Sequence, residues 1–323
     1  MDYFLGFDTS NYKTSIAVAG SDGTVVRDVR RFLNVKKGNR GLRQSEALFQ
    51  HVMNIQDIAP QLMLDPDIRG NIRAVAVSSR PRPEEGSYMP VFNAGISAGR
   101  LAAELLGVPC YEFSHQEGHI EAVRRGSGLE QAERFVSFHF SGGTTEAVLT
   151  EDPGAQGEHA RYTIVGGSRD LAFGQLLDRV GVSLGMEFPC GEEMDAIAVS
   201  SDAEPQKLPR IAAKDGFINI SGIETCCQRL IGSTSREALI RGIFQEVTHA
   251  IEKMTNQIAE KYHVNQFLFA GGVSASRFVR SHLNCDTDIY FGDPHMSTDN
   301  AAGIALLGGK KYGRQTDHCI TAE

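Results

Sequence analysis

The sequence predicts an α/β protein made of two similar lobes, and three observations support this. Short apolar segments rich in β-branched residues, typical of strands, alternate with longer segments whose apolar residues recur at helical spacing. This order of strands and helices starts again near residue 134. The two copies also align residue by residue where each begins. Each copy has the order βββαβαβα, which predicts two mixed α/β lobes with a cleft between them.

The first copy begins with three apolar segments separated by turns, and these predict strands over 3–10, 13–20 and 23–35. Helices and strands then alternate. The helices are predicted at 44–64 and 93–107, and the strands at 72–79 and 109–114. A further helix holds His115 and His119.

The second copy begins with a strand, a glycine turn and a strand over 134–152, and a third strand follows at 160–167. The remaining elements are predicted from the same patterns. They are helices at 170–185 and 235–263, a strand at 266–272, a helix at 274–284, a strand at 288–293 and a closing helix at 298–312.

The start of the second copy repeats the start of the first. When residues 5–18 are laid over 136–149, Ser10 falls on Ser141 and Thr14 on Thr145. We therefore expect one lobe over 1–115, completed by the closing helix at 298–313, and a second lobe over 116–297. Ligands of open α/β sheets bind at the carboxyl ends of strands, near turns of this kind.

Composition sets limits on the class of protein. The chain has 323 residues, 41% hydrophobic and 22% charged, which is ordinary for a globular protein. We see no signal peptide and no apolar run approaching the roughly 20 residues of a membrane span. The six cysteines form no CxxC pair, so we expect reduced thiols and a cytoplasmic location. The net charge of −8 argues against nucleic-acid binding by bulk electrostatics but leaves room for a local basic patch.

The two histidines of "HQEGH" stand four residues apart. On a helix, His115 and His119 share one face and could bind one metal ion together. A catalytic base, or two polar residues of an ordinary helix, would have the same spacing.

Two glycine pairs follow predicted strands and could expose backbone N–H groups to an anion. Ser141, Gly142 and Gly143 form a turn between two strands, and Gly271 and Gly272 lie between a strand and a helix. Ordinary hairpin and strand–helix turns would also contain these glycines.

Four acidic residues stand where a ligand could reach them. Asp178 lies on the same predicted helix face as Asp170 and Gly174, and Asp195 lies one turn after Gly191, which begins a helix. Asp299 lies at the start of the closing helix. Helix capping or a solvated helix face would also explain such carboxylates.

In combination and in this order, the motifs resemble the TsaD family of tRNA adenosine threonylcarbamoyltransferases, once labelled glycoprotease or peptidase M22. The similarity runs from about residue 3 to residue 308. It begins with "GFDTSNYKTSIAV", "HQEGH", "SGGTT" and "DLAFGQLLDR" and continues with "FPCG", "ISGIET", "AGGVSAS" and "STDNAA". The resemblance implies the actin/Hsp70/sugar-kinase fold.

The resemblance also implies a metal site and an adenylate site. The metal, iron or zinc, would be held by His115, His119 and Asp299. Contacts to an adenine nucleotide or ATP-derived acyl-adenylate would come from a larger set of residues. They are His139, Phe140, Ser141, Gly142, Gly143, Asp178, Gly191, Asp195, Gly271, Gly272 and Ser276. No catalytic residue is assigned, and the candidates are Asp8, Ser10 and Lys13. The implied partners are tRNA and accessory subunits or a paralogue, with no membrane.

Several positions depart from the family pattern. Acidic residues usual after the first Thr-Ser turn are Tyr12 and Lys13, the histidine of "SGGHT" is Thr144, and the asparagine of "GGVSAN" is Ser276. These departures suggest a diverged paralogue. It could transfer threonylcarbamoyl to tRNA, use another acceptor in a carbamoyl-type transfer, or bind nucleotide without catalysis.

A basic surface would favour the tRNA alternative. The arginines that could form one are Arg80, Arg82, Arg124 and Arg125.

Overall fold

The computed structural model describes residues 1–10, 12–35, 42–152, 160–297 and 301–320, with side chains as far as residue 316. The chain forms two compact units. The first contains Met1–Arg125 and His295–Glu323, and the second contains Gly126–Pro294. The lobe bounds given above from the sequence stay a prediction. Among the described residues, no helix combines the length and the apolar composition that crossing a bilayer requires.

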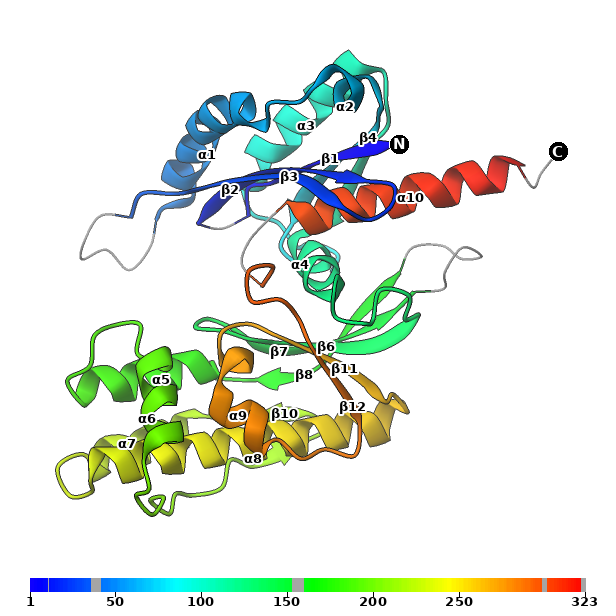
Figure 1. Ribbon diagram of the computed structural model, residues 1–323. Coiled ribbons are helices and arrows are strands. Elements are labelled where there is room, and N and C mark those ends of the chain that lie inside the picture. The colour runs from blue at the N-terminus through cyan, green and yellow to red at the C-terminus, as the bar shows by residue number, and fades with distance from the viewer. Residues whose placement is uncertain (11, 36–41, 153–159, 298–300, 321–323) are drawn as a thin grey trace. The chain divides into compact units, whose positions relative to one another are not determined.

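The first unit is a five-stranded sheet with helices on both faces (Figure 1). The strand order is β3-β2-β1-β4-β5, with β1 Tyr3–Asp8, β2 Lys13–Gly20, β3 Val25–Phe32, β4 Ile72–Arg80 and β5 Cys110–Ser114. Helices α1 (Gln44–Ile58) and α3 (Phe92–Leu106) cover one face, and α10 (Ala302–Ile320) and α4 (His115–Arg124) lie on the other. The short helices η1 (Ala59–Leu62) and α2 (Pro66–Gly70) connect α1 to β4.

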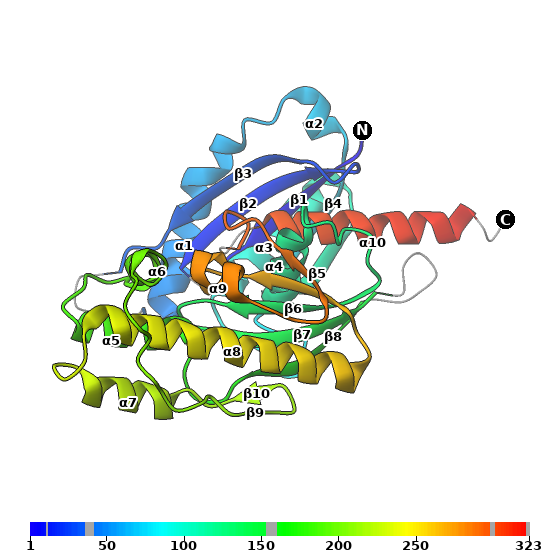
Figure 2. The same cartoon turned by 60° about the horizontal axis from the view of Figure 1, so that its bottom comes forward.

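The second unit is a seven-stranded sheet in the order β12-β11-β6-β7-β8-β10-β9. Its strands are β6 Arg134–Phe140, β7 Thr145–Glu151, β8 Arg161–Ser168, β9 Ala213–Lys214, β10 Phe217–Ile218, β11 Gln266–Ala270 and β12 Asp288–Phe291. Its helices are α5 Phe173–Ser183, α6 Gly191–Ser200, α7 Ser221–Leu230, α8 Arg236–Tyr262, η3 Val273–Ala275 and α9 Arg277–His282. Figure 2 shows α8 running along this unit, with β9 and β10 at the sheet edge.

The predicted duplication is confirmed by topology and by register. Strands β8-β7-β6-β11-β12 repeat the order β3-β2-β1-β4-β5, with antiparallel and parallel pairs in the same places. Asp8 pairs with Ser15 in the first sheet, and His139 pairs with Glu146 in the second. The overlay of residues 5–18 on 136–149 places Asp8 on His139 and Ser15 on Glu146, so the same two positions pair in each sheet.

Some elements differ from the predicted ones. The helix expected over 44–64 ends as an α-helix at Ile58 and continues as the 3₁₀ turn η1, which contains Pro60. The sequence patterns predict no strand or helix within 213–230, whereas the structure has β9, β10 and α7 there. Its hairpin turn is Asp215-Gly216, both with positive φ, which is a strong hairpin signal in a sequence.

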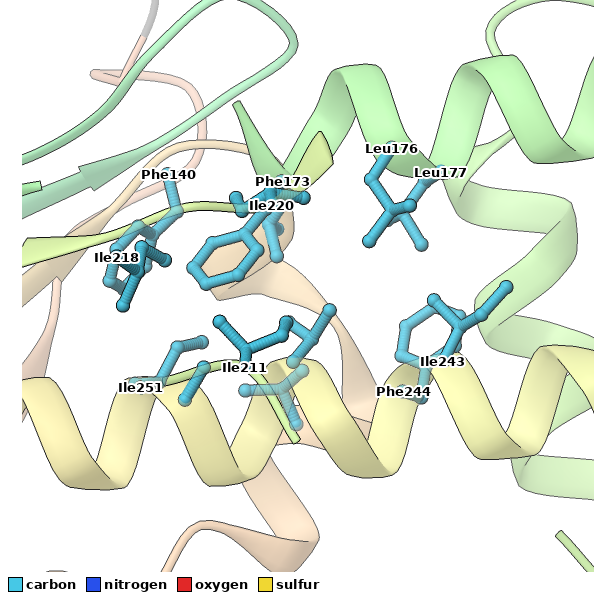
Figure 3. Packing of buried hydrophobic residues seen from close by; sticks show 14 of the residues in the cluster. Phe140, Phe173, Leu176, Leu177, Ile211, Ile218, Ile220, Ile243, Phe244 and Ile251 are labelled. Carbon is cyan, nitrogen blue, oxygen red and sulfur yellow. The ribbon is translucent and has the colours of Figure 1, made fainter. Parts of the chain in front are cut away.

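One hydrophobic core fills the second unit between the sheet and its helices. Figure 3 shows Leu176 and Leu177 of α5 facing Ile243 and Phe244 of α8 across this core. Phe140 of β6 is part of it, 4.8 Å from the Phe138 ring and 5.5 Å from the Phe173 ring between centroids. Alternate residues of β6 therefore point into the core, and Ser137 and His139 point to the other face.

Helix α10 lies close to β1 and α4 because glycines leave room for its backbone. A Cβ on Gly6 would lie 2.6 Å from the carbonyl oxygen of Ala301, and one on Gly303 only 1.8 Å from that of Gly118. A Cβ on Gly118 would meet the Ile304 side chain at 2.7 Å. The glycines of "GFDTS" and "HQEGH" are therefore explained by the approach of this helix.

We expect Gly303→Ala to destabilise the first unit far more than Gly118→Ala. The methyl group at residue 303 meets backbone that cannot move aside, so we expect a loss of about 3 kcal/mol. At residue 118 the clash is with the end of the flexible Ile304 side chain, so we expect roughly 1 kcal/mol. Both changes gain the same helix propensity, so urea unfolding followed by circular dichroism compares them directly. Equal losses would contradict this account of the helix contact.

Candidate functional site

In the first unit, Asp8 ends β1 on the face of the sheet that α10 covers. It pairs with Ser15, so the two side chains share a face. The Ser15 hydroxyl oxygen accepts a hydrogen bond of 2.9 Å from the backbone N–H of Ala301, just before α10 begins. The strand end and the helix start are therefore held together on this side.

The Asp8 carboxylate is fully buried and surrounded by donors. Ser78 Oγ of β4 donates to Oδ1 at 2.6 Å, and Ser10 Oγ donates to Oδ2 at 3.1 Å. His115 Nδ1 lies 3.0 Å from Oδ2. Three side chains from separate parts of the unit therefore meet at one carboxylate.

His115 is the first residue of α4, and a capping box fixes this start. Ser114 Oγ accepts from the Glu117 N–H, and Glu117 Oε2 accepts from the Ser114 N–H at 2.6 Å. His119 follows one turn later, with its ring centroid 4.3 Å from that of His115. The two predicted metal-binding histidines thus lie together on one helix face.

The other two catalytic candidates are Ser10, which follows β1, and Lys13, which begins β2. Ser10 Oγ is 3.4 Å from His115 Nε2. Lys13, the first residue of β2, is only 9% exposed, and its Nζ lies 4.6 Å from the centroid of the Phe32 ring. Lys13 shares the face of Ser15, two residues further along the strand.

The chemistry of His115, His119 and Asp8 is compatible with a bound metal ion. Two imidazoles on one helix face are ligands that zinc and iron accept, and a carboxylate behind one of them is the usual outer support of a metal-binding histidine. The predicted third ligand, Asp299, lies outside the described residues. Within the described residues, no three His, Cys, Asp or Glu side chains gather as a metal-binding group.

In the second unit, the glycine turn after β6 lies against two other glycines. Gly174 of α5 leaves no room for a Cβ, which would lie 2.5 Å from Gly142 Cα. Gly271 follows β11 with φ +92°, and a Cβ there would lie 2.3 Å from the Phe140 carbonyl oxygen. A Cβ on Gly142, Gly143 or Gly272 would meet nothing within 4 Å, so these backbones border open space.

Within the turn after β6, some of the backbone N–H groups already donate to the Ser141 hydroxyl. Ser141 Oγ accepts from the Thr144 N–H at 3.1 Å and lies 3.4 Å from the Gly143 nitrogen. The Phe140 side chain is fully buried in the core. A nucleotide contact from Phe140 would therefore have to come from its backbone, whereas His139 lies on the opposite face of the strand.

The remaining predicted nucleotide contacts form two local pairs. Asp178 Oδ1 accepts from the Cys190 N–H at 2.8 Å, which fixes the start of α6 at Gly191. Asp195 accepts from the Ser276 hydroxyl and from the N–H groups of Arg277 and Phe278, both at 3.0 Å. Asp195 and Ser276 together cap α9. The nucleotide-binding roles of these residues stay predictions.

Residues 33–306 match the family of tRNA N6-adenosine threonylcarbamoyltransferases, TsaD. The chain belongs to this family. It is 28% identical to a tRNA N6-adenosine threonylcarbamoyltransferase of Sulfurihydrogenibium sp. (strain YO3AOP1), over 95% of this chain and 90% of that protein. It is equally similar, at 28%, to one of Geobacillus thermodenitrificans (strain NG80-2), over 99% of this chain and 95% of that protein. The family is one of enzymes, as the sequence predicted.

Solved structures of low sequence identity share the fold. Component A of (R)-2-hydroxyglutaryl-CoA dehydratase from Acidaminococcus fermentans has a TM-score of 0.54 at 14% identity, covering 97% of this chain and all of that one. Full-length HypF, in a phosphate- and nucleotide-bound form, has a TM-score of 0.57 at 13% identity, covering 97% of this chain and 55% of that one. The predicted actin/Hsp70/sugar-kinase fold class is confirmed.

The basic patch considered for a TsaD-type RNA substrate is partly occupied by ion pairs. Arg124 is 4% exposed and lies 3.6 Å from Glu121, and Arg80 lies 3.7 Å from Glu117. Arg124 therefore contributes nothing to an outer basic surface of this unit.

Two residues beside the candidate site are not predicted from the sequence. Ser15 accepts from Ala301 and Ser78 donates to Asp8, and only their closeness to the carboxyl ends of β1 and β4 could have suggested a role. Asp170 was considered as a ligand, but its carboxylate accepts from the N–H groups of Ile220 and Ser221 at 2.7 and 3.0 Å. It thus holds the start of α7 within the "ISGIET" motif of this TsaD-family chain.

Asp170 should make stability depend on acid pH. Partial burial opposes its charge, but the N–H donors of Ile220, Ser221 and Leu171 prevail and hold its pKa well below 3.8. A lowered folded-state pKa stabilises the protein above the unfolded value, and this stability is lost as pH falls towards the folded value. We expect Asp170→Asn to lower the urea midpoint at neutral pH, with the difference from wild type shrinking below about pH 4. A difference that stays constant down to about pH 2 would contradict this role of the carboxylate.

Proposed function

We propose that the chain transfers a threonylcarbamoyl group from threonylcarbamoyl-adenylate to the tRNA adenosine next to the anticodon, with a divalent metal bound in the first unit. Membership of the TsaD family supports the reaction class. The observation that carries the metal site is the His115–His119 pair backed by the buried Asp8 carboxylate.

The proposed metal ligands are His115, His119 and Asp299, and the metal is iron or zinc. When bound, it supplies a Lewis acid that polarises an oxygen of the transferred group or its phosphate. The assignment is supported by the capping box of α4 and the contact with α10, which fix the position of the helix that carries both rings.

The adenylate would bind in the second unit, with the open backbone at Gly142, Gly143 and Gly272 approaching its phosphate. The structurally engaged residues Asp178, Asp195 and Ser276 would shape this region by fixing the starts of α6 and α9. We further propose that the chain acts in the cytoplasm, with accessory subunits or a paralogue as partners.

A transfer assay tests this function. The metal-loaded protein is mixed with isotope-labelled threonylcarbamoyl-adenylate and unmodified tRNA, and label on the tRNA is counted. We expect His115→Ala and His119→Ala to lose most of the bound metal and to reduce transfer at least ~10²-fold, because each removes a ligand. His249→Ala is the matched control, since this histidine belongs to α8 of the second unit, where it lies 3.7 Å from Glu252.

The outcomes separate the alternatives. Label on tRNA that depends on His115 establishes the proposed reaction. Bound metal and bound adenylate without labelled tRNA would favour a carbamoyl-type transferase with another acceptor, or a non-catalytic nucleotide-binding paralogue. Full metal content in His115→Ala would overturn the ligand assignment.

A further inference from the structure

We infer that Asp8 is the positioning residue of the metal site and that it also directs Ser10 Oγ towards the ion as a further ligand. This inference rests on the proposed metal binding. It adds two residues of this chain to the site, one acting through His115 and one contacting the ion directly.

A single carboxylate oxygen determines where two hydrogens point. Asp8 Oδ2 lies 3.0 Å from His115 Nδ1 and 3.1 Å from Ser10 Oγ. A carboxylate offers only acceptors, so the imidazole and the hydroxyl both direct their hydrogen towards it. A neutral imidazole carries one ring hydrogen, and with that hydrogen on Nδ1 the lone pair of His115 is at Nε2.

The two acceptor atoms so oriented have the spacing of neighbouring ligands. His115 Nε2 and Ser10 Oγ are 3.4 Å apart. Two ligand atoms each about 2.1 Å from a tetrahedral zinc ion lie roughly 3.4 Å from each other. Because the hydroxyl hydrogen of Ser10 is directed to Asp8, this short approach of two acceptors is favourable when a cation lies between them.

The carboxylate is rigid enough to impose this arrangement. It is fully buried at the end of β1, and its other oxygen accepts from Ser78 Oγ at 2.6 Å. Outer residues that orient a metal-binding histidine typically change metal affinity by 10–100-fold when they are replaced.

The first test measures metal affinity, independently of activity. Zinc and iron(II) are titrated into metal-free full-length protein in competition with a chelator of known affinity. We expect Asp8→Asn and Ser10→Ala each to weaken binding by about 10–100-fold. Asp22→Asn is the matched control, because this exposed carboxylate also accepts from a hydroxyl, that of Thr24 at 2.6 Å, and we expect no change.

The second test needs no variant. Nitrogen-15 NMR of the histidine rings in metal-free wild-type protein should show His115 with its hydrogen on Nδ1. If Asp8→Asn does not fold, this spectrum and the affinity of Ser10→Ala still decide the matter.

The outcomes distinguish this inference from the proposed function. If wild-type protein binds neither metal, the proposed metal site fails and this inference with it. If wild type binds metal and loses it in His115→Ala, but Asp8→Asn and Ser10→Ala bind as tightly as wild type, only this inference is overturned. A hydrogen on Nε2 of His115 in the metal-free protein would also overturn it.

Discussion

The first unit depends on one steric constraint, the contact of bare backbone between α10 and the elements beneath it. Gly303 meets the Gly118 carbonyl of α4, and Gly6 of β1 meets Ala301 and Ala305. These contacts leave no room for side chains, so they fix the height and rotation of α10 over the sheet. The same contact holds α4 in place. This helix begins at His115 and carries His119 one turn later. The candidate metal site thus takes its geometry from glycines that carry no chemistry.

The carboxylates of the candidate site region divide into two kinds. Asp170 and Asp195 of the second unit accept from the N–H groups that begin α7 and α9, and each also accepts from one serine hydroxyl. Asp8 of the first unit accepts instead from the side chains of Ser10, Ser78 and His115. A carboxylate that caps a helix stabilises local structure, whereas one surrounded by orientable side chains determines which way their hydrogens point.

The repeated strands, the duplication and the fold class could be predicted from the sequence, because apolar periodicity and the overlay of Ser10 on Ser141 are local signals. The segment 213–230 was missed because its strands have only two residues each and its helix carries few buried side chains. The histidine pair could be recognised by spacing. The roles of Ser15, Ser78 and Gly303 could not, because each acts on a residue distant in the chain, at a separation that no local pattern encodes. The core position of Phe140 likewise follows from packing against Phe173 and Phe269.

The first unit takes its last helix from the far end of the chain, and this affects how it can form during synthesis. The second unit is one continuous stretch, Gly126–Pro294, and all of it leaves the ribosome before α10 does. Until then, the part of the five-stranded sheet that packs against α10, with Gly6, Ala17 and Ala19, lacks that helix. Domains commonly fold as they emerge, the earlier one first. Here the order is inverted, because the unit that begins the chain is completed last. A chain that ends before residue 301 contains every residue of the second unit but lacks the helix that completes the first.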